Sequence, residues 1–402
     1  MKARNEIKNQ YNVPMSSPDL TDAERRAIFE VIQTPNLSMG PQIESFEAAF
    51  RGFTGRKYAL GVNSGTAGLH LCVQAADIKE GDMVITTPFS FVSSSNVMLF
   101  ERAIPVFVDV EPITGNIDTK LVQSAVADLS NYGVNAKRWL PRSGRQKSGK
   151  IKAILPVHVY GQPTDMDPIL QVAKDFDLKV IEDACEAVGS EFKGRKAGTL
   201  GDYSVFAFYP NKQITTGEGG MVVTDDDAAA ELMLALRNQG RAPGDTWLQH
   251  KFLGYNYRLG ELNAALGNVQ LSRIEDIITK REMVANWYHE RLEQISGVET
   301  TSVVPNTTRM SWFVYVIRTD PGISRESISQ GLKVKGIPSR PYFIPIHLQP
   351  YMRERFGYRK GDFPISEDLG NRCLAIPFSG VMTENQVETV CNALKDTLQE
   401  LS

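Results

Sequence analysis

Between about residue 40 and residue 225, apolar and polar positions follow two different patterns. Short, nearly continuous apolar runs predict buried strands, and the segments between them carry apolar residues at helical spacing. Buried strands separated by helices are typical of a mainly parallel sheet with helices on both faces, which is an α/β fold class. The predicted strands are 57–62, 83–87, 104–110, 151–159, 178–181, 203–209 and 221–224, and the predicted helices are 42–53, 65–76, 91–102, 121–129 and 168–176.

The pattern changes after residue 259. Residues 260–295 have helical periodicity, no proline, and only Gly260 and Gly267 as helix breakers. This predicts one long helix or a kinked pair that joins two domains. A strand at 311–318, short helices and an aromatic, proline-rich segment follow. We therefore expect a large domain over 1–259, including an N-terminal arm at 1–35, and a smaller α+β domain over 260–402.

Composition narrows the class of protein. With 42% hydrophobic and 23% charged residues the chain is an ordinary globular protein, and 44 Lys and Arg against 47 Asp and Glu argue against nucleic-acid or membrane-surface binding. The four cysteines form no CxxC or Cys/His spacing, so neither a zinc site nor a disulfide framework is expected. The N-terminus lacks the apolar core of a signal peptide, and no apolar run is long enough to span a membrane. We expect a soluble, cytoplasmic protein without a metal.

Residues 131–152, called here the basic segment, carry seven basic residues and no acidic one. Such a run is usually a solvated insertion. The alternative is a loop that meets an anionic ligand.

The first candidate for chemistry is the turn at 63–68, between the first strand and the next helix. Ser64, Gly65, Thr66 and Ala67 are small, so the N–H groups at the helix start are accessible, and the helix dipole adds partial positive charge. This arrangement is able to bind a phosphate, although an ordinary N-cap turn has the same appearance. No Lys-Ser or Lys-Thr follows at the spacing of a Walker loop.

The second candidate is Asp183, at the carboxyl end of a buried strand, where ligands bind in open α/β sheets. A carboxylate buried there needs a partner. No His or third carboxylate lies close in sequence to suggest a metal, so a cationic ring is the better partner.

The third candidate is Lys212, which follows an aromatic strand and precedes the glycine-rich turn at 217–220. A loop lysine is ordinarily solvated, but a desolvated one is able to attack a carbonyl carbon and form a Schiff base. A phosphate cradle, a buried aspartate and a lysine in this order predict a pyridoxal phosphate site. The phosphate would lie at the helix start and Asp183 would pair with the ring nitrogen. Lys212 would form a Schiff base with the carbonyl carbon of the cofactor.

These motifs resemble the DegT/DnrJ/EryC1/StrS family of sugar aminotransferases, which have the aspartate-aminotransferase fold (fold type I). The resemblance runs from about residue 36 to the C-terminus, and its strongest markers lie at 63–69, 182–187 and 211–220. It implies a large domain with a mainly parallel sheet and a smaller C-terminal domain.

The resemblance also implies roles for further residues. Phe91 would stack on the cofactor ring, unless it is a core aromatic, and Glu186 would contact the ring hydroxyl. Asn256 would reach the phosphate bound by a neighbouring subunit, which implies a homodimer with shared active sites. Tyr342 and His347 lie in the stretch that is close to substrate in relatives, where a purely structural role is the alternative.

One position departs from the family pattern. Many relatives have a serine five residues before the lysine that bonds the phosphate, and this chain has Ala207. The phosphate then needs other donors, for which Ser64, Thr66 and Asn211 are the candidates.

The resemblance implies transfer of an amino group from an amino acid, expected to be glutamate, to a nucleotide-linked keto-sugar, expected to be a 4-keto-6-deoxyhexose, in amino-sugar or polysaccharide biosynthesis. The alternatives are an aminotransferase for a cyclitol ketone and a non-catalytic regulator with the same fold. Related sugar dehydratases have a histidine in place of the lysine, so Lys212 argues against that activity.

Overall fold

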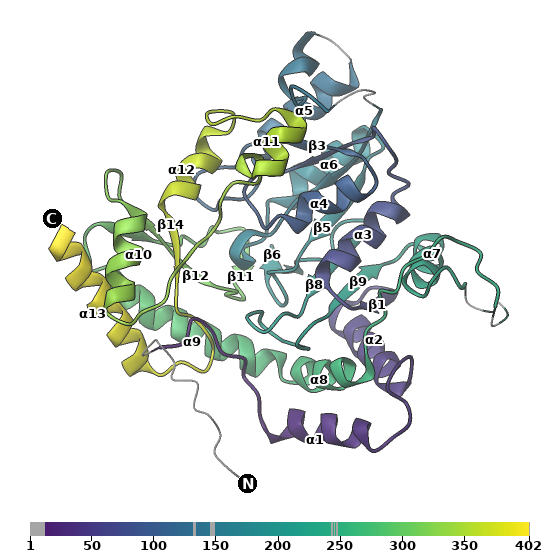
Figure 1. Cartoon of the computed structure of the whole chain (residues 1–402), viewed down its shortest axis with the longest axis horizontal. Coiled ribbons are helices and arrows are strands. Elements are labelled where there is room, and N and C mark those ends of the chain that lie inside the picture. Colours follow the sequence, from purple (N-terminus) through teal and green to yellow (C-terminus); the bar gives the residue numbers. More distant parts are fainter. Residues whose placement is uncertain are drawn as a thin grey trace.

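A seven-stranded sheet forms the centre of the computed structural model, which describes residues 13–131, 134–144, 149–242, 244, 246 and 248–401 (Figure 1). The strand order is β1-β9-β8-β5-β4-β2-β3. Neighbours from β8 to β3 are parallel, and β9 is antiparallel to both β1 and β8. The expected mainly parallel sheet is therefore confirmed. The strands are β1 (Tyr58–Val62), β2 (Met83–Thr86), β3 (Ile104–Phe107), β4 (Ile151–Leu155), β5 (Lys179–Asp183), β8 (Tyr203–Ala207) and β9 (Gly220–Thr224).

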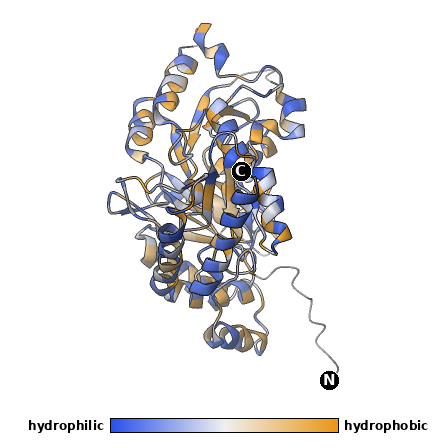
Figure 2. Ribbon diagram, turned by 90° about the vertical axis from the view of Figure 1, so that its left-hand side faces the viewer, coloured by the Kyte–Doolittle hydropathy of each residue, from blue (hydrophilic) through white to orange (hydrophobic). Residues whose placement is uncertain are grey.

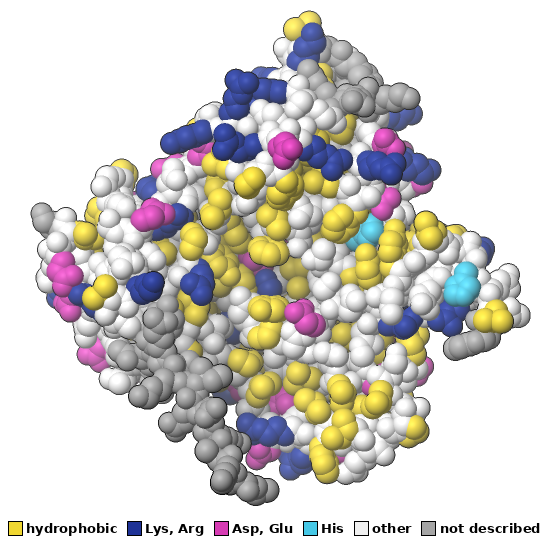
Figure 3. Space-filling view, viewed as in Figure 1, with side chains coloured by type: hydrophobic (Ala, Val, Ile, Leu, Met, Phe, Trp, Pro, Cys, Tyr) yellow, Lys and Arg dark blue, Asp and Glu magenta, His cyan; other side chains and the backbone are white. Residues whose placement is uncertain are grey.

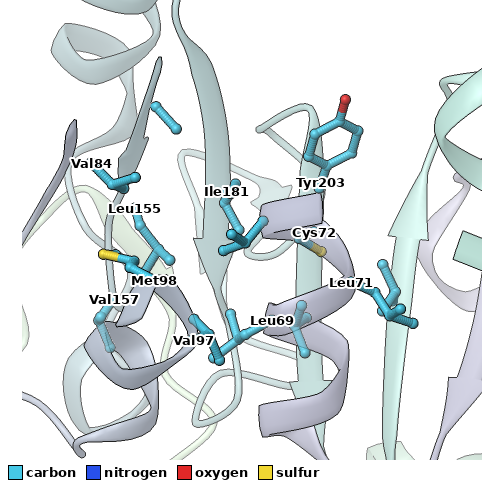
Figure 4. Packing of buried hydrophobic residues seen from close by; sticks show 14 of the residues in the cluster. Leu69, Leu71, Cys72, Val84, Val97, Met98, Leu155, Val157, Ile181 and Tyr203 are labelled. Carbon is cyan, nitrogen blue, oxygen red and sulfur yellow. The ribbon is translucent and has the colours of Figure 1, made fainter. Parts of the chain in front are cut away.

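Helices cover both faces of this sheet. One face carries α3 (Gly65–Ala75), α4 (Ser93–Phe100) and α7 (Asp227–Arg237), and the other carries α2 (Pro41–Thr54), α5 (Thr119–Ser130) and α6 (Met166–Asp175). Successive strand residues point to opposite faces, so Val84 packs under α3 and α4 while Ile85 packs under α5 and α6. Figure 4 shows side chains of α3 and α4 lying over Leu155, Ile181 and Tyr203 of the strands.

The predicted helix at 260–295 is a kinked pair, α8 (Glu261–Ser272) and α9 (Ile274–Leu292), with the break at Arg273. The pair leads from the large sheet to a smaller antiparallel sheet of order β10-β12-β14-β13. This second sheet packs against α10 (Arg325–Val334) and α13 (Glu384–Leu401). Its strands are β10 (Val298–Thr300), β12 (Tyr315–Thr319), β13 (Arg340–Pro341) and β14 (Cys373–Ile376).

Smaller elements complete the chain. A three-stranded sheet of order β11-β6-β7 lies beside the two larger ones, with β6 (Glu191–Phe192), β7 (Arg195–Lys196) and β11 (Thr307–Arg309). Short helices are the 3₁₀ helices Val134–Arg138, Val159–Gly161 and Ile346–Leu348, and the α-helices α11 (Pro350–Phe356) and α12 (Pro364–Arg372). In Figure 2 the interior strands are largely orange, and blue residues lie mainly on the outer sides of the helices.

The N-terminal arm contacts both domains. Val13 is buried in the core of the smaller domain, and the carbonyl of Met15 accepts a hydrogen bond from Phe378 N. Helix α1 (Asp22–Ile32) then packs along α8.

Within the described part of the chain, no helix has both the length and the apolar character needed to cross a membrane.

The basic segment uses several of its charges internally. Arg138 pairs with Asp128, and Arg142 pairs with Asp362 of the smaller domain. The backbone N of Ser143 donates to the carbonyl of Phe356 at 3.1 Å, so this part of the segment is attached to α11. Dark blue side chains gather over this upper part of the molecule in Figure 3. Arg145 and Lys147 lie outside the described residues.

Candidate active site

A cavity of about 480 Å³ lies at the carboxyl ends of the parallel strands, between the two domains. Parallel strands all end at the same edge of a sheet, so the loops that follow them meet there. In Figure 3, yellow side chains gather around the middle of this face. The predicted residues that line the cavity are Ser64, Gly65, Thr66, Phe91, Asp183, Glu186, Asn211, Lys212 and Tyr342.

The start of α3 forms one wall of the cavity. Ser64 is the N-cap residue, and its Oγ accepts a hydrogen bond from Ala67 N at 3.1 Å, so Ala67 belongs to the cap and does not itself line the cavity. A Cβ on Gly65 would lie 2.8 Å from Cβ of Ala207 and 2.9 Å from Sγ of Cys185. Only glycine therefore lets the backbone approach this wall. The first N–H groups of the helix have no intrahelical acceptors and suit an anion.

Asp183 ends β5 on the face of the sheet that carries α3 and α4. Its Oδ2 accepts a hydrogen bond from Ser94 Oγ at 2.8 Å, and its Oδ1 accepts one from Cys185 N at 3.2 Å. Ser90 Oγ lies 2.9 Å from Ser94 Oγ and extends this network. The side chain is buried but borders the cavity, so its position is fixed while the carboxylate still faces a ligand.

Lys212 lies in the loop after β8 and, like Asp183, lines the cavity. Its Nζ is 3.6 Å from Oε1 of Glu186 and 3.8 Å from the ring centroid of Phe313. Burial raises the pKa of Glu186 above its ordinary value, and the nearby Lys212 and a hydrogen bond from Tyr160 N offset this only in part. The lysine amine is therefore held between a carboxylate and an aromatic face, with most of its side chain out of water.

Two predicted aromatic residues, Phe91 and Tyr342, also line the cavity. The Phe91 side chain is 63% exposed, so it is not the core aromatic of the alternative interpretation. Tyr342 comes from the smaller domain, and burial raises the pKa of its phenol. Its backbone carbonyl accepts a hydrogen bond from the Tyr160 hydroxyl, which ties the smaller domain to the large one.

The structure does not place Asn256 or His347 in this cavity. Asn256 is exposed, and its carbonyl accepts a hydrogen bond from Asn63 Nδ2 at 3.2 Å. His347 is fully buried, with Nε2 2.9 Å from Oε1 of Glu367 and its ring 4.7 Å from that of Phe363. His347 is not among the residues that line the cavity, so the structure gives the expected contact with substrate no support. The structural alternative describes it better.

The residues at the start of α3 also fit a phosphate in the absence of the family's serine. Thr66 Oγ1 and Ser93 Oγ are 2.9 Å apart, and both residues line the cavity beside Ala207. Asn211 also lines the cavity, and its side-chain amide carries two N–H donors. Hydroxyl and amide groups are therefore present where a bound phosphate would need donors.

Some residues of the site were missed by sequence reasoning. Ser94, in the first turn of α4, follows Phe91 by three residues, and Phe91 itself precedes the helix. The predicted helix at 91–102 could have suggested that the two residues lie on one side. Phe313 had no local signal, because it comes from the segment before β12 and reaches Lys212 only in the folded chain.

The fold and this cavity define the class of protein, a pyridoxal phosphate-dependent transferase of fold type I. The sequence profile of the DegT/DnrJ/EryC1/StrS aminotransferase family matches residues 18–395, so the chain belongs to that family. It is accordingly an enzyme, an aminotransferase, and its cofactor is pyridoxal 5'-phosphate.

Individual relatives agree with this assignment over nearly their whole lengths. The chain is 37% identical to GDP-perosamine synthase of Caulobacter vibrioides, with 96% of this chain and 98% of the relative covered. It is 35% identical to the spore coat polysaccharide biosynthesis protein SpsC of Bacillus subtilis, with 98% of each covered. Among solved structures, it resembles Helicobacter pylori PseC, an aminotransferase involved in the biosynthesis of pseudoaminic acid, with a TM-score of 0.85, 26% identity, and coverage of 96% of this chain and 99% of that one.

Proposed function

We propose that the protein transfers the amino group of an amino acid, namely glutamate, to a nucleotide-linked keto-sugar, namely a 4-keto-6-deoxyhexose. The observation that carries this proposal is the convergence of Lys212, Asp183, Glu186 and the start of α3 on one cavity. The name of the GDP-perosamine synthase relative supports a nucleotide-linked sugar as the acceptor.

Lys212 is the proposed catalytic residue. When bound, pyridoxal phosphate withdraws electrons from the carbon that carries the transferred nitrogen. The Nζ of Lys212 removes a proton from that carbon and returns one in the reverse direction, as a positioned general base and acid. The Phe313 ring next to this amine and the buried walls of the cavity limit competing proton exchange with water. Donor and acceptor use the same cavity in turn.

The remaining residues bind and orient the cofactor. Asp183, held by Ser94 and Cys185 N, provides the negative charge that keeps a proton on the ring nitrogen. Glu186 would face the ring hydroxyl, and Phe91 would cover a face of the ring. The α3 start with Ser64, Gly65, Thr66 and Ala67 would hold the phosphate, together with the hydroxyl of Ser93 and the amide of Asn211.

The working form is proposed to be a homodimer in the cytoplasm. The exposed side chain of Asn256 lies outside the cavity of its own chain, which supports a contact with the phosphate bound by a second subunit. All four cysteines are free, which is typical of a reducing compartment. Tyr342 is proposed to contact the substrate.

A substrate panel tests this proposal. Purified protein with pyridoxal phosphate is incubated with glutamate and with UDP-, GDP- and dTDP-linked 4-keto- and 3-keto-sugars, and a cyclitol ketone is included. Mass spectrometry should detect an amino-sugar from a nucleotide-linked 4-keto-6-deoxyhexose and none with Lys212→Ala. Turnover of the cyclitol ketone alone would establish the competing activity, and full turnover by Lys212→Ala would refute the role of the lysine.

A further inference from the structure

The loop that carries Lys212 is anchored to the interdomain helices on both sides of the lysine. Thr215 N, three residues after Lys212, donates a hydrogen bond to Oε1 of Gln270 on α8 at 3.2 Å. The carbonyl of Asn211, one residue before it, accepts from Nη2 of Arg281 on α9 at 3.4 Å. Neither helical residue lines the cavity. The two helices therefore act on the lysine from behind the loop.

Gln270 is buried, and both ends of its amide are used. Its Nε2 donates to the carbonyl of Asp19 and to Oε1 of Glu24, each at 2.8 Å. A rotated amide would place its NH₂ group against the N–H of Thr215, so only one orientation satisfies all these groups. The acceptor oxygen is therefore held toward the loop by the N-terminal arm.

Glu24 provides the fixed point of this chain of contacts. Its side chain is almost fully buried, and its charge is balanced by Arg273 at 2.6 Å, the residue at the α8–α9 kink. Burial would raise the pKa of the Glu24 carboxyl, but hydrogen bonds from Thr21, Gln270 and Arg273 lower it to about 2. The acceptor for Gln270 is thus a carboxylate at any pH at which the enzyme is expected to work.

Arg281 acts on the lysine by a second route. Its guanidinium is buried, and within the described chain its hydrogen-bond acceptors are backbone carbonyls rather than carboxylates. Nε donates to the Trp312 carbonyl at 2.7 Å, and Nη2 donates to that of Phe313 at 2.8 Å. The Phe313 ring in turn lies under the amine of Lys212. The planar fork of donors holds the wall and the loop together.

We propose that Gln270 and Arg281 are positioning residues for Lys212, and that Glu24 of the N-terminal arm fixes Gln270. The inference rests on the proposed role of Lys212. A lysine on a loop has four rotatable side-chain bonds, and a catalytic group needs to be held within about 0.5 Å of its working position. Anchoring the loop on both sides of the lysine removes backbone movement from that requirement.

The test compares Gln270→Met with the matched control Thr397→Val. Both changes remove hydrogen bonds from a buried side chain, but among the described residues Thr397 Oγ1 bonds only the carbonyl of Ala393 within α13. Misplacement of a catalytic group by about 1 Å costs up to ~100-fold, so Gln270→Met is expected to lower kcat about tenfold. KM for glutamate should stay within about twofold, since its binding groups are unchanged. Thr397→Val should retain the kcat of the unaltered protein.

Titration with pyridoxal phosphate provides a readout that does not depend on turnover. The visible absorption of the lysine-linked cofactor should saturate at a concentration about fivefold higher in Gln270→Met than in Thr397→Val, because the amine is less well placed. Arg281→Lys keeps the charge but loses the planar fork, and it should change kcat and cofactor affinity in the same direction.

A charge swap tests the contact with the N-terminal arm. Gln270→Glu keeps an acceptor for Thr215 N but places two carboxylates together, so its kcat should fall. Adding Glu24→Gln restores a donor between the two side chains and should recover part of that loss. If Gln270→Met does not fold, the kcat values of the charge-swap variants and of Arg281→Lys test the positioning role instead.

Two results separate the failures. If folded Gln270→Met and Arg281→Lys match Thr397→Val in kcat and in cofactor titration, the positioning role is wrong while the role of Lys212 stands. If Lys212→Ala itself turns over substrate normally, the proposed function fails first.

Discussion

Glu182 and Asp183 are adjacent acidic residues with opposite surroundings. Glu182 points to the α2 and α6 side of the sheet and is fully buried, with donors on all sides: Nε2 of His158, Oγ of Ser204, and the backbone N of Gly198, Leu200 and Gly201. Asp183 points to the α3 and α4 side, accepts two hydrogen bonds and borders the cavity. The period of two in a strand places one carboxylate inside the protein and the next at the cavity.

The difference shows how the two kinds of acidic group are recognised. A carboxylate has about four acceptor positions, and those of Glu182 are occupied by protein donors. Asp183 keeps acceptor capacity on the side of the cavity. Burial alone does not identify a functional carboxylate, but burial with unused acceptor positions beside a cavity does.

The largest effect is expected on the Asp183 side. Asp183→Asn keeps the size of the side chain and removes the charge that is proposed to hold the proton on the ring nitrogen. Steady-state kinetics should show kcat lower by at least about a hundredfold, at 1.36 kcal/mol per tenfold. The free energy of unfolding should change little. A decrease in kcat smaller than fivefold would contradict the proposed role of Asp183.

Glu182→Gln should produce the opposite result, a loss of stability with kcat nearly preserved. The glutamine NH₂ group would face N–H donors, and unpairing a buried charged network costs about 3 kcal/mol. Denaturant unfolding measures the loss. If instead kcat fell as far as in Asp183→Asn with no loss of stability, the assignment of roles would have to be reversed.

The unaltered protein and Glu182→Gln should also differ in how their stability responds to acid. Burial would raise the pKa of Glu182, but hydrogen bonds from His158 and backbone N–H groups and the His158 charge hold it below the ordinary value of 4.5. A depressed folded-state pKa adds stability above the unfolded value and loses it as pH falls through the folded one. The gap in unfolding free energy between the unaltered protein and Glu182→Gln should therefore narrow below pH 4.5.

A smaller effect concerns Asn256, which is proposed to complete the cavity of a second subunit. Inactive Lys212→Ala and an inactive Asn256 variant are mixed under conditions of subunit exchange. Half of the dimers are then heterodimers with one intact site of two, so about a quarter of the activity should return. Absence of any recovery would place Asn256 at the site of its own chain.

The smallest effect is expected for Arg142, which resembles Glu182 in having its partners inside the protein. The Arg142 guanidinium contacts both carboxylate oxygens of Asp362, at 2.5 and 2.7 Å, while its side chain remains half exposed. Arg142→Ala should leave KM for the nucleotide-sugar within about twofold and cost at most ~1 kcal/mol of stability. A large rise in KM at low salt would show instead that the basic segment binds the substrate.

Prediction from sequence was most complete where the chemistry is local. Ser64 to Ala67, Asp183 and Lys212 lie at or shortly after a strand end, and a strand end is visible in the sequence. Prediction was weakest in the smaller domain. His347 shares a motif with Tyr342, yet it packs against Glu367 and Phe363 away from the cavity, because side-chain direction depends on the fold around it.

The sequence by itself indicated the order of the strands in the large sheet and the segments around Ser64, Asp183 and Lys212 that line the cavity, because each depends on a short pattern and on the geometry of one element. It did not indicate α1 or α7. Only the tertiary structure decided which side chains support the segments that line the cavity. Ser94 reaches Asp183 from α4, Phe313 reaches Lys212 from the smaller domain, and Gln270 reaches the lysine loop with Glu24 behind it. These partners are separated by tens to hundreds of residues, and contacts over such separations exist only after the layers have packed.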